Sequence, residues 1–350
     1  MKLALQLGYW GADPIVDAPE LIAAAEGSGF DAVFTAESWG SDAYTPLAWW
    51  GAATSRIRLG TAVAQLSARP PTSLAMHALT LDHLSGGRHI IGLGVSGPQV
   101  VEGWYGQPFG KPLARTREYV QIVRDVLSRA DRVRSAGPHY PLPYPADAPG
   151  ATGLGKSLKP ITHPLRADIP IWLGAEGPKN VAQTAEIADG WIPHLFHPEK
   201  AHLVWGDALE AGNAKRQDGL EPLQVMAGGM VAIGEGPETK ALLDFVRPIF
   251  ALYVGGMGAK GKNFYNDVAR AYGYEKEAEE IQDLYLSGKK KEAEALIPTE
   301  WLEAANLVGP ASYVKERIEA FREAGVTDLS VVPASDDPAA TVAQVREWVS

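Results

Sequence analysis

The chain has 350 residues, of which 46% are hydrophobic and 21% are charged, and it contains no cysteine. This length suits two ordinary domains or one large α/β barrel, and the apolar content is sufficient for a packed core. Without cysteine, disulfides, thiolate metal sites and a cysteine nucleophile are excluded. The net charge of −10 argues against nucleic-acid binding, and no run approaches the ~20 apolar residues of a membrane span. We therefore expect a cytoplasmic protein that binds neither nucleic acid nor membrane.

One sequence pattern repeats along the chain: a short apolar run rich in β-forming residues, a turn, and then a stretch with helical periodicity. Such alternation predicts βαβ units and a parallel sheet. The predicted strands are residues 3–9, 32–36, 57–63, 89–95, 169–174, 191–196, 224–233 and 328–332. The predicted helices are residues 18–25, 46–54, 72–84, 115–128, 178–188, 199–211 and 339–349. This pattern favours a closed (β/α)8 TIM barrel over a doubly wound open sheet, which usually places a glycine-rich phosphate fingerprint after its first strand.

Two segments interrupt this strand–helix pattern. Residues 135–167, dense in Pro, Gly and Tyr, precede the fifth strand, and residues 237–326, mostly helical in pattern, separate the seventh strand from the eighth. Long additions to a compact domain usually shape a site. We interpret both as insertions in a single barrel domain that spans residues 1–350. The expected contacts with a small-molecule substrate are Tyr140, Tyr144, Phe264, Tyr265 and Asn266.

The active site of such a barrel gathers at the carboxyl ends of its strands. Glu37 and Ser38 follow the second predicted strand, Gln65 follows the third, and His194 falls within the sixth. Glu37 either handles a proton, with a pKa raised by partial burial, or pairs with a nearby Arg or Lys. His194 is either a proton-transfer residue or a hydrogen-bonded core histidine. The histidines between residues 77 and 89 lack metal-ligand spacing, so no metal site is expected.

Two turns resemble anion sites because each precedes a candidate helix or turn. They are Ser96-Gly97 and Glu176-Gly177-Pro178-Lys179-Asn180. Free backbone N–H groups at a helix start bind phosphate, and Pro178 suits a first helical position. Ordinary strand-to-helix turns have the same composition, and spacing alone favours that interpretation.

Several motifs follow one another in a fixed order over essentially the whole chain. They are Ala24-Ala25-Glu26-Gly27-Ser28-Gly29-Phe30-Asp31, Thr35-Ala36-Glu37-Ser38, Arg58-Leu59-Gly60-Thr61-Ala62-Val63, residues 79–88, residues 92–97, Gly174-Ala175-Glu176-Gly177-Pro178 and Ala188-Asp189-Gly190-Trp191. In this order they resemble the bacterial-luciferase-like oxidoreductases, and among these the branch that uses the deazaflavin coenzyme F420. The resemblance implies a barrel with the deazaflavin at its carboxyl-end mouth, and a homodimer.

The resemblance also assigns site residues. It implies a non-proline cis peptide at Ala62-Val63 that lies against the ring, and it gives segments 96–97 and 175–180 to the ring edge and the phosphate of the cofactor tail. This reverses the preference for ordinary turns. The cofactor-binding residues so implied are Ala62, Val63, Gln65, Ser96, Gly97, Ala175, Glu176, Gly177, Pro178, Lys179 and Asn180. The candidate catalytic residues are Glu37, Ser38 and His194.

Two positions depart from the pattern of the family's sugar-phosphate dehydrogenases. Ser38 stands where those enzymes have a histidine, and Pro98 stands where they have a glutamate. We therefore expect an F420-dependent oxidoreductase that transfers hydride between the deazaflavin and a different small organic substrate. The alternatives are an FMN-dependent monooxygenase that uses reduced flavin and oxygen, and a non-catalytic cofactor-binding barrel.

Overall fold

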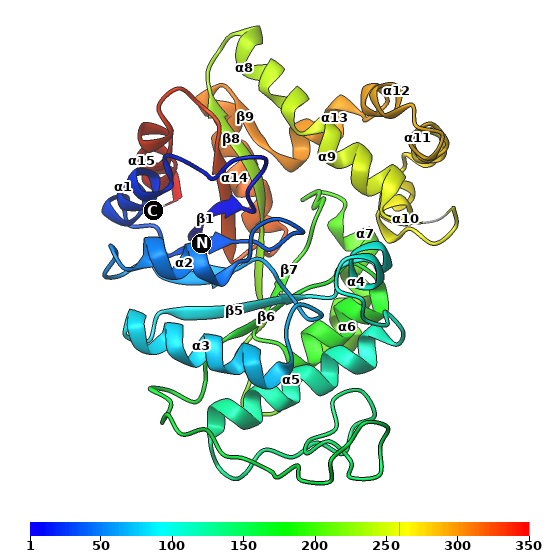
Figure 1. Cartoon of the computed structure of the whole chain (residues 1–350). Coiled ribbons are helices and arrows are strands. Elements are labelled where there is room, and N and C mark those ends of the chain that lie inside the picture. The colour runs from blue at the N-terminus through cyan, green and yellow to red at the C-terminus, as the bar shows by residue number, and fades with distance from the viewer. Residues whose placement is uncertain (259, 350) are drawn as a thin grey trace. The chain divides into compact units, whose positions relative to one another are not determined.

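The computed structural model describes residues 1–258 and 260–349, in which short strands alternate with helices (Figure 1). The chain folds into two compact units. Unit 1 comprises Met1–Leu7, Val16–Val33 and the chain from Ala175 onward, and unit 2 comprises Gly8–Ile15 and Phe34–Gly174. Strand β2 (Ala32–Thr35) belongs partly to each. The interpretation of residues 1–350 as one domain stays a prediction.

Unit 2 contains a small parallel sheet with helices between its strands. Its strands are β3 (Arg58–Thr61), β4 (Ala64–Gln65), β5 (His89–Gly94) and β6 (Ile171–Gly174). Its helices are α2 (Tyr44–Gly51), α3 (Pro71–Ser85), α4 (Pro98–Gly103) and α5 (Pro112–Ser128). Strand β5 pairs in parallel with β3, β4 and β6. Helices α3, α4 and α5 each begin with proline, which has no N–H to leave unpaired in a first turn.

The core of unit 2 depends on glycine as well as on aromatic residues. Phe34 stacks on Trp172 with 5.5 Å between ring centroids. A Cβ at Gly60 would lie 2.2 Å from the Phe34 ring, so only glycine lets β3 approach that ring. In Figure 1, α3 and α5 lie side by side next to β5, and their buried aliphatic side chains supply the rest of this core.

The predicted insertion at residues 135–167 is irregular and belongs to unit 2. Each end of the insertion is bound to a helix of unit 2. Glu118 of α5 accepts hydrogen bonds from the backbone N–H groups of His139 at 3.2 Å and Tyr140 at 2.5 Å. Arg166 forms an ion pair with Asp82 of α3 at 2.8 Å. The insertion is therefore anchored to the helices that flank it.

Unit 1 contains a second parallel sheet. Its strands are β1 (Lys2–Gly8), β7 (Gly190–Ile192), β8 (Gln224–Ile233), β9 (Leu307–Gly309) and β10 (Asp328–Pro333). Strand β8 pairs with β7, β9 and β10, and β10 also pairs with β1. The last strand of the chain thus pairs with the first, as the closure of a barrel requires.

Unit 1 also holds most of the helices. Those that alternate with its strands are α1 (Ala18–Ser28), α6 (Pro178–Ile187), α7 (Ala201–Asn213), α14 (Ala311–Glu323) and α15 (Pro338–Val349). The predicted insertion at residues 237–326 contributes α8 (Pro237–Ala241), η1 (Leu242–Phe245), α9 (Arg247–Ala251), the π-helical turn η2 (Leu252–Gly256), α10 (Phe264–Ala271), α11 (Glu275–Leu286), α12 (Lys290–Ala295) and α13 (Thr299–Ala305). Helices α9 to α13 gather in one helical arm in Figure 1. None of the described helices combines the length and the apolar character needed to cross a membrane.

The fold is the predicted closed (β/α)8 barrel, with β1, β2, β3, β5, β6, β7, β8 and β10 as its strands. Several strands are shorter than predicted, among them β3 (predicted 57–63) and β6 (predicted 169–174), and the largest difference is in the sixth barrel strand. We expected the sixth strand to span residues 191–196 and to include His194, but β7 ends at Ile192. Pro193 follows at once and cannot donate a hydrogen bond to a neighbouring strand, so His194 lies in the loop after β7. The short strands β4 and β9 and helix α4 were not predicted.

Candidate functional site

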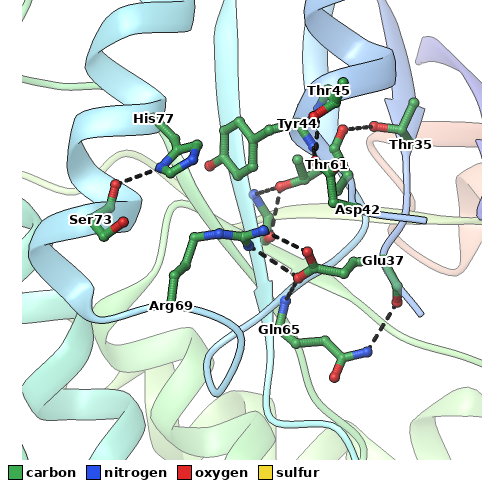
Figure 2. Close-up of polar contacts among 12 residues, drawn as sticks. Thr35, Glu37, Asp42, Tyr44, Thr45, Thr61, Gln65, Arg69, Ser73 and His77 are labelled. Carbon is green, nitrogen blue, oxygen red and sulfur yellow. Dashed lines mark hydrogen bonds and ion pairs between the residues drawn. The ribbon is translucent and has the colours of Figure 1, made fainter. Parts of the chain in front are cut away.

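The end of β2 in unit 2 carries Glu37, which lies in an ion pair (Figure 2). Arg69 donates hydrogen bonds to both carboxylate oxygens, at 2.6 and 3.1 Å. The side chains of Arg69 and Glu37 are only 13% and 3% exposed. A two-point Arg–carboxylate pair fixes both distance and orientation. Of the two roles left open for Glu37, the structure therefore shows the pairing with a nearby cation.

Gln65 completes this cluster. Its backbone N–H donates to Glu37 Oε2 at 2.8 Å, and its side-chain amide donates to the Glu37 carbonyl oxygen at 3.1 Å. Gln65 is buried, yet its Oε1 atom has no hydrogen-bond partner within residues 1–258 and 260–349. A buried acceptor without a partner is costly, so this atom is suited to a ligand N–H or O–H.

The peptide bond between Ala62 and Val63 is cis, as the resemblance implied. The backbone around it is tied to the neighbouring strand, because Ala62 N–H donates to Thr35 O at 2.7 Å and Glu37 N–H donates to Val63 O at 3.2 Å. A Cβ at Gly94 of β5 would lie 2.5 Å from Val63 Cγ2. Glycine at this position therefore leaves room for the Val63 side chain.

Two tyrosines, Tyr44 and Tyr119, contact Arg69. The guanidinium lies 5.5 Å from the centroid of the Tyr44 ring, and Tyr119 donates a hydrogen bond to Arg69 O at 3.0 Å. Burial raises the pKa of Tyr44 and lowers the pKa of His89, beside it, to about 4. Asp42 accepts hydrogen bonds from the first N–H groups of α2 and so fixes the entry of Tyr44 into the cluster (Figure 2). These contacts hold the Arg69–Glu37 pair in place.

The other predicted residues of unit 2 lie near strand ends without such partners. Ser38 donates its backbone N–H to Ser41 O at 3.3 Å. Ser96 has the left-handed φ of 58°, uncommon for a residue with a side chain. Gly97 is the N-cap of α4, whose six residues make little more than one turn. The structure thus brings Glu37 and Gln65 into direct contact, and it shows no hydrogen bond from them to Ser96 or Gly97 among the described residues.

In unit 1, the predicted segment from Ala175 to Asn180 forms the start of α6. Gly177 is the N-cap, Pro178 occupies the first helical position, and the N–H groups of Asn180 and Val181 donate to Gly177 O. Lys179 is exposed, whereas Asn180 Oδ1 is buried and has no hydrogen-bond partner in the described part of the chain. A helix start with a lysine beside it favours an anion.

Glu176 lies just before this helix, and its carboxyl group forms no ion pair with the other described residues. The backbone N–H of His194 donates to its Oε1 at 2.6 Å, and Trp205 donates its indole N–H to the Glu176 carbonyl oxygen at 2.8 Å. Burial raises the pKa of Glu176 well above its ordinary value, and the His194 hydrogen bond offsets only part of that rise. Its Oε2 is occluded and has no hydrogen-bond partner among the described residues. Burial therefore disfavours the charged form of the Glu176 carboxyl group.

His194 packs against rings of the insertion at residues 237–326. Its ring centroid lies 4.1 Å from that of Tyr253 in η2 and 6.1 Å from that of Tyr265 in α10. Burial lowers the pKa of His194 to about 4, and its Nε2 has no hydrogen-bond partner in the described chain. The sequence prediction missed Tyr253. The only available signal was its place in an apolar run just before Gly255 and Gly256.

Comparison with known proteins identifies the family. The model of the luciferase-like monooxygenase family matches residues 4–328. This chain belongs to that family. A Mycobacterium tuberculosis protein that is provisionally named a coenzyme F420-dependent oxidoreductase is 57% identical over 337 residues, which cover 96% of either chain. The chain is thus an oxidoreductase of the luciferase-like family.

Solved structures confirm the fold of this luciferase-like chain. The coenzyme F420-dependent tetrahydromethanopterin reductase from Methanopyrus kandleri superimposes with a TM-score of 0.78 over 99% of this chain and 97% of that one, at 23% identity. An F420-dependent secondary alcohol dehydrogenase, solved with an F420–acetone adduct, gives 0.74 over 99% and 98%, at 16% identity. At these identities the likeness establishes the barrel alone.

Proposed function

We propose that this chain binds coenzyme F420 and transfers hydride between the deazaflavin and a small organic substrate. The observation that carries the proposal is the 57% identity, over 96% of both chains, to the mycobacterial protein provisionally named as F420-dependent. When bound, F420 supplies a ring carbon that takes or gives a hydride in a two-electron step. Since the chain has no cysteine, a bound organic ring is a suitable redox group.

Each unit, taken by itself, offers groups of the kind that a phosphorylated deazaflavin needs. In unit 2, the unpaired Gln65 Oε1 is available to accept from an N–H at a ring edge. The Arg69–Glu37 pair holds Gln65 through two hydrogen bonds, so this acceptor is oriented before any ligand arrives. Ala62 and Val63, with Ser96 and Gly97, are proposed to shape the surface for the ring.

In unit 1, the start of α6 is proposed to hold the tail phosphate. The first N–H groups of a helix have no carbonyl partner within it, and the helix dipole favours negative charge at that end. Lys179 adds a mobile cation next to Gly177 and Pro178. This local positive potential is needed because the chain as a whole carries a net charge of −10.

The direct test is cofactor binding to the purified chain. We expect the chain to quench F420 fluorescence saturably and to bind FMN much more weakly. Tight FMN binding without F420 binding would refute the proposal and favour a monooxygenase. F420 binding without turnover across ketones, alcohols and activated alkenes would instead favour a non-catalytic barrel.

A charge variant tests the proposed phosphate site. Lys179→Ala should weaken F420 binding and reduce its salt dependence, because one cation near a phosphate is lost. Lys276→Ala on α11, also exposed, is the matched control and should change neither quantity. If both variants behave like the wild type, the tail phosphate does not bind at the start of α6.

A further inference from the structure

The insertion at residues 135–167 carries most of a surface patch that the candidate site does not use. The patch combines three aliphatic side chains with three basic ones, namely Leu154, Leu158, Ile161, Arg132, Lys156 and Lys159, and we call it the 154–161 patch. Its three aliphatic residues are 79%, 73% and 94% exposed. Large aliphatic side chains that are grouped together in water usually mark an interaction surface.

Hydrogen bonds hold the main chain of this patch against the end of α5. Val133 N–H donates to Leu158 O at 2.8 Å, and Arg129 Nε donates to Pro160 O at 2.9 Å. In Figure 1 this part of the insertion belongs to the irregular trace below α3 and α5. Leu158 and Ile161 are therefore exposed on a main chain that is held in place, and their exposure does not come from a loose loop.

The local charge of the patch is opposite to that of the whole chain. Arg132 donates to Ser157 O at 3.4 Å, and Lys159 donates to Ala130 O at 3.0 Å, so two segments of the chain lie side by side here. These segments, residues 129–134 and 154–161, contain one acidic residue, Asp131, and five basic ones, namely Arg129, Arg132, Arg134, Lys156 and Lys159. This local excess of cations favours an anionic occupant, although the whole chain carries a net charge of −10.

The patch is separate from the candidate site of unit 2. Tyr119 of α5 contacts Arg69 in that site, whereas Arg129, the C-cap of the same helix, contacts the patch. The ten residues from Tyr119 to Arg129 span about 15 Å of helix. A ligand on the patch would therefore not occupy the place proposed for the deazaflavin ring.

We propose that the 154–161 patch docks this chain on the surface of an anionic lipid bilayer. Its aliphatic side chains are buried at the boundary between headgroups and acyl chains, and Lys156 and Lys159 contact the lipid phosphates. A bilayer accepts separate aliphatic side chains without the matching pocket that a protein partner would have to supply. The net charge and the lack of a long apolar run led us to expect no membrane contact, but contact at the surface requires only this local patch. The proposal goes beyond the proposed function and does not depend on it.

Vesicle flotation of the full chain tests the docking. One set of vesicles consists of phosphatidylcholine alone, and the other also contains about 30% phosphatidylglycerol, which is anionic. The wild type should float with the anionic vesicles and bind the neutral ones at least tenfold more weakly. Salt at about 0.5 M should release most of the bound chain, because it screens the attraction between lysines and phosphates.

A charge variant tests the basic part of the patch. The double variant Lys156→Gln/Lys159→Gln should lower the partition coefficient on anionic vesicles about thirtyfold, because each lysine beside an anionic surface contributes about fivefold. The control is Lys215→Gln/Lys276→Gln, which removes two exposed lysines of unit 1. Its partition coefficient should stay within about twofold of the wild-type value.

An apolar variant tests the aliphatic part. Leu158→Ser/Ile161→Ser should lower the partition coefficient at least tenfold, because less apolar area is buried in the bilayer. Leu203→Ser/Leu286→Ser, which changes two exposed leucines of unit 1, is the control and should have little effect. Circular dichroism of each variant separates a loss of binding from a failure to fold.

Several outcomes would overturn the proposal. They are a wild type that floats with neither kind of vesicle, equal flotation with both kinds, and wild-type flotation of the two patch variants. Analytical ultracentrifugation detects a different occupant. If the wild type did not float and Leu158→Ser/Ile161→Ser converted a dimer into a monomer, the patch would be a contact between copies of this chain, and the proposal would be wrong.

Discussion

Two glutamates of this chain occupy equivalent places and have opposite surroundings. Glu37, which belongs to unit 2, follows barrel strand β2, and Glu176, which belongs to unit 1, follows barrel strand β6. Glu37 receives two hydrogen bonds from Arg69 and one from Gln65, whereas Glu176 receives one, from His194. The first carboxyl group is held by a cation. The second has a pKa raised by burial, and its Oε2 has no hydrogen-bond partner among the described residues. Partners, and not topological position, decide which strand-end carboxyl group is available for chemistry.

The largest loss of stability is expected when the charge of Glu37 is removed. Glu37→Gln leaves the Arg69 guanidinium largely buried without a carboxylate, and should lower the free energy of unfolding by about 3–5 kcal/mol. Urea denaturation measures this change in the free energy of unfolding. Glu319→Gln, which breaks the exposed pair with Arg322, should cost about 1 kcal/mol or less. A small loss in both variants would show that the buried pair has no structural role.

His194, which contacts Glu176, provides a test of these buried surroundings. The measurement is the free energy of unfolding as a function of pH. The pKa of His194 is lowered from 6.5 to about 4, so between these values the unfolded chain binds a proton that the folded chain does not. Stability is therefore lost as the pH falls through this range, by up to about 3 kcal/mol.

The difference between wild type and His194→Gln isolates this contribution, because His89 and His197 titrate in the same range. His202→Gln, which changes an exposed histidine on α7, is the control. A difference curve that is flat between pH 6.5 and pH 4 would mean that His194 is protonated alike in both states.

The unit 2 cluster is tested next through its backbone. Gly94→Ala places a methyl group against Val63 Cγ2 and should cost about 1–3 kcal/mol of unfolding free energy. Gly103→Ala is the matched control, because nothing lies within 4 Å of an added Cβ there. The double variant Gly94→Ala/Val63→Ala should recover part of the loss in thermal unfolding, and no recovery would locate the strain elsewhere.

The smallest effect is expected at Glu176, and it sharpens the contrast with Glu37. Because the pKa of Glu176 is raised above 4.5 in the folded chain, this group binds its proton more tightly in the folded chain, and its contribution to wild-type stability falls as the pH rises above about 4.5. Glu176→Gln removes this dependence. The free energy of unfolding of this variant should lie within about 1 kcal/mol of the wild-type value at pH 4. It should increase relative to the wild-type value as the pH rises. Urea titrations at several pH values check the sign, and an opposite slope would contradict the raised pKa of Glu176.

The sequence predicted the barrel because its signal is local. Apolar runs followed by helical periodicity placed each of the eight strands, and the proline at residue 178 marked the start of α6 correctly. The largest boundary error, at His194, came from reading Pro193 as part of an apolar strand. Alternation indicates which segments are strands, and a proline within such a segment ends its pairing.

The site was only partly predictable because its contacts join distant segments. Glu37 and Arg69 are 32 residues apart, and the sequence left their pairing open. Nothing local indicated that Tyr253 would cover His194, because the path of a long insertion depends on tertiary packing. The unpaired oxygens of Gln65 and Glu176 were likewise invisible, since a lack of partners is a property of the folded surroundings.

Gly177 and Phe264 show that the insertion and the barrel are mutually adapted. The ring of Phe264 covers the place that a side chain at residue 177 would need. A chimaera that receives residues 252–267 from another barrel must therefore take a compatible residue 177 with it. An engineer who exchanges this segment has to treat residues 177 and 264 as one module.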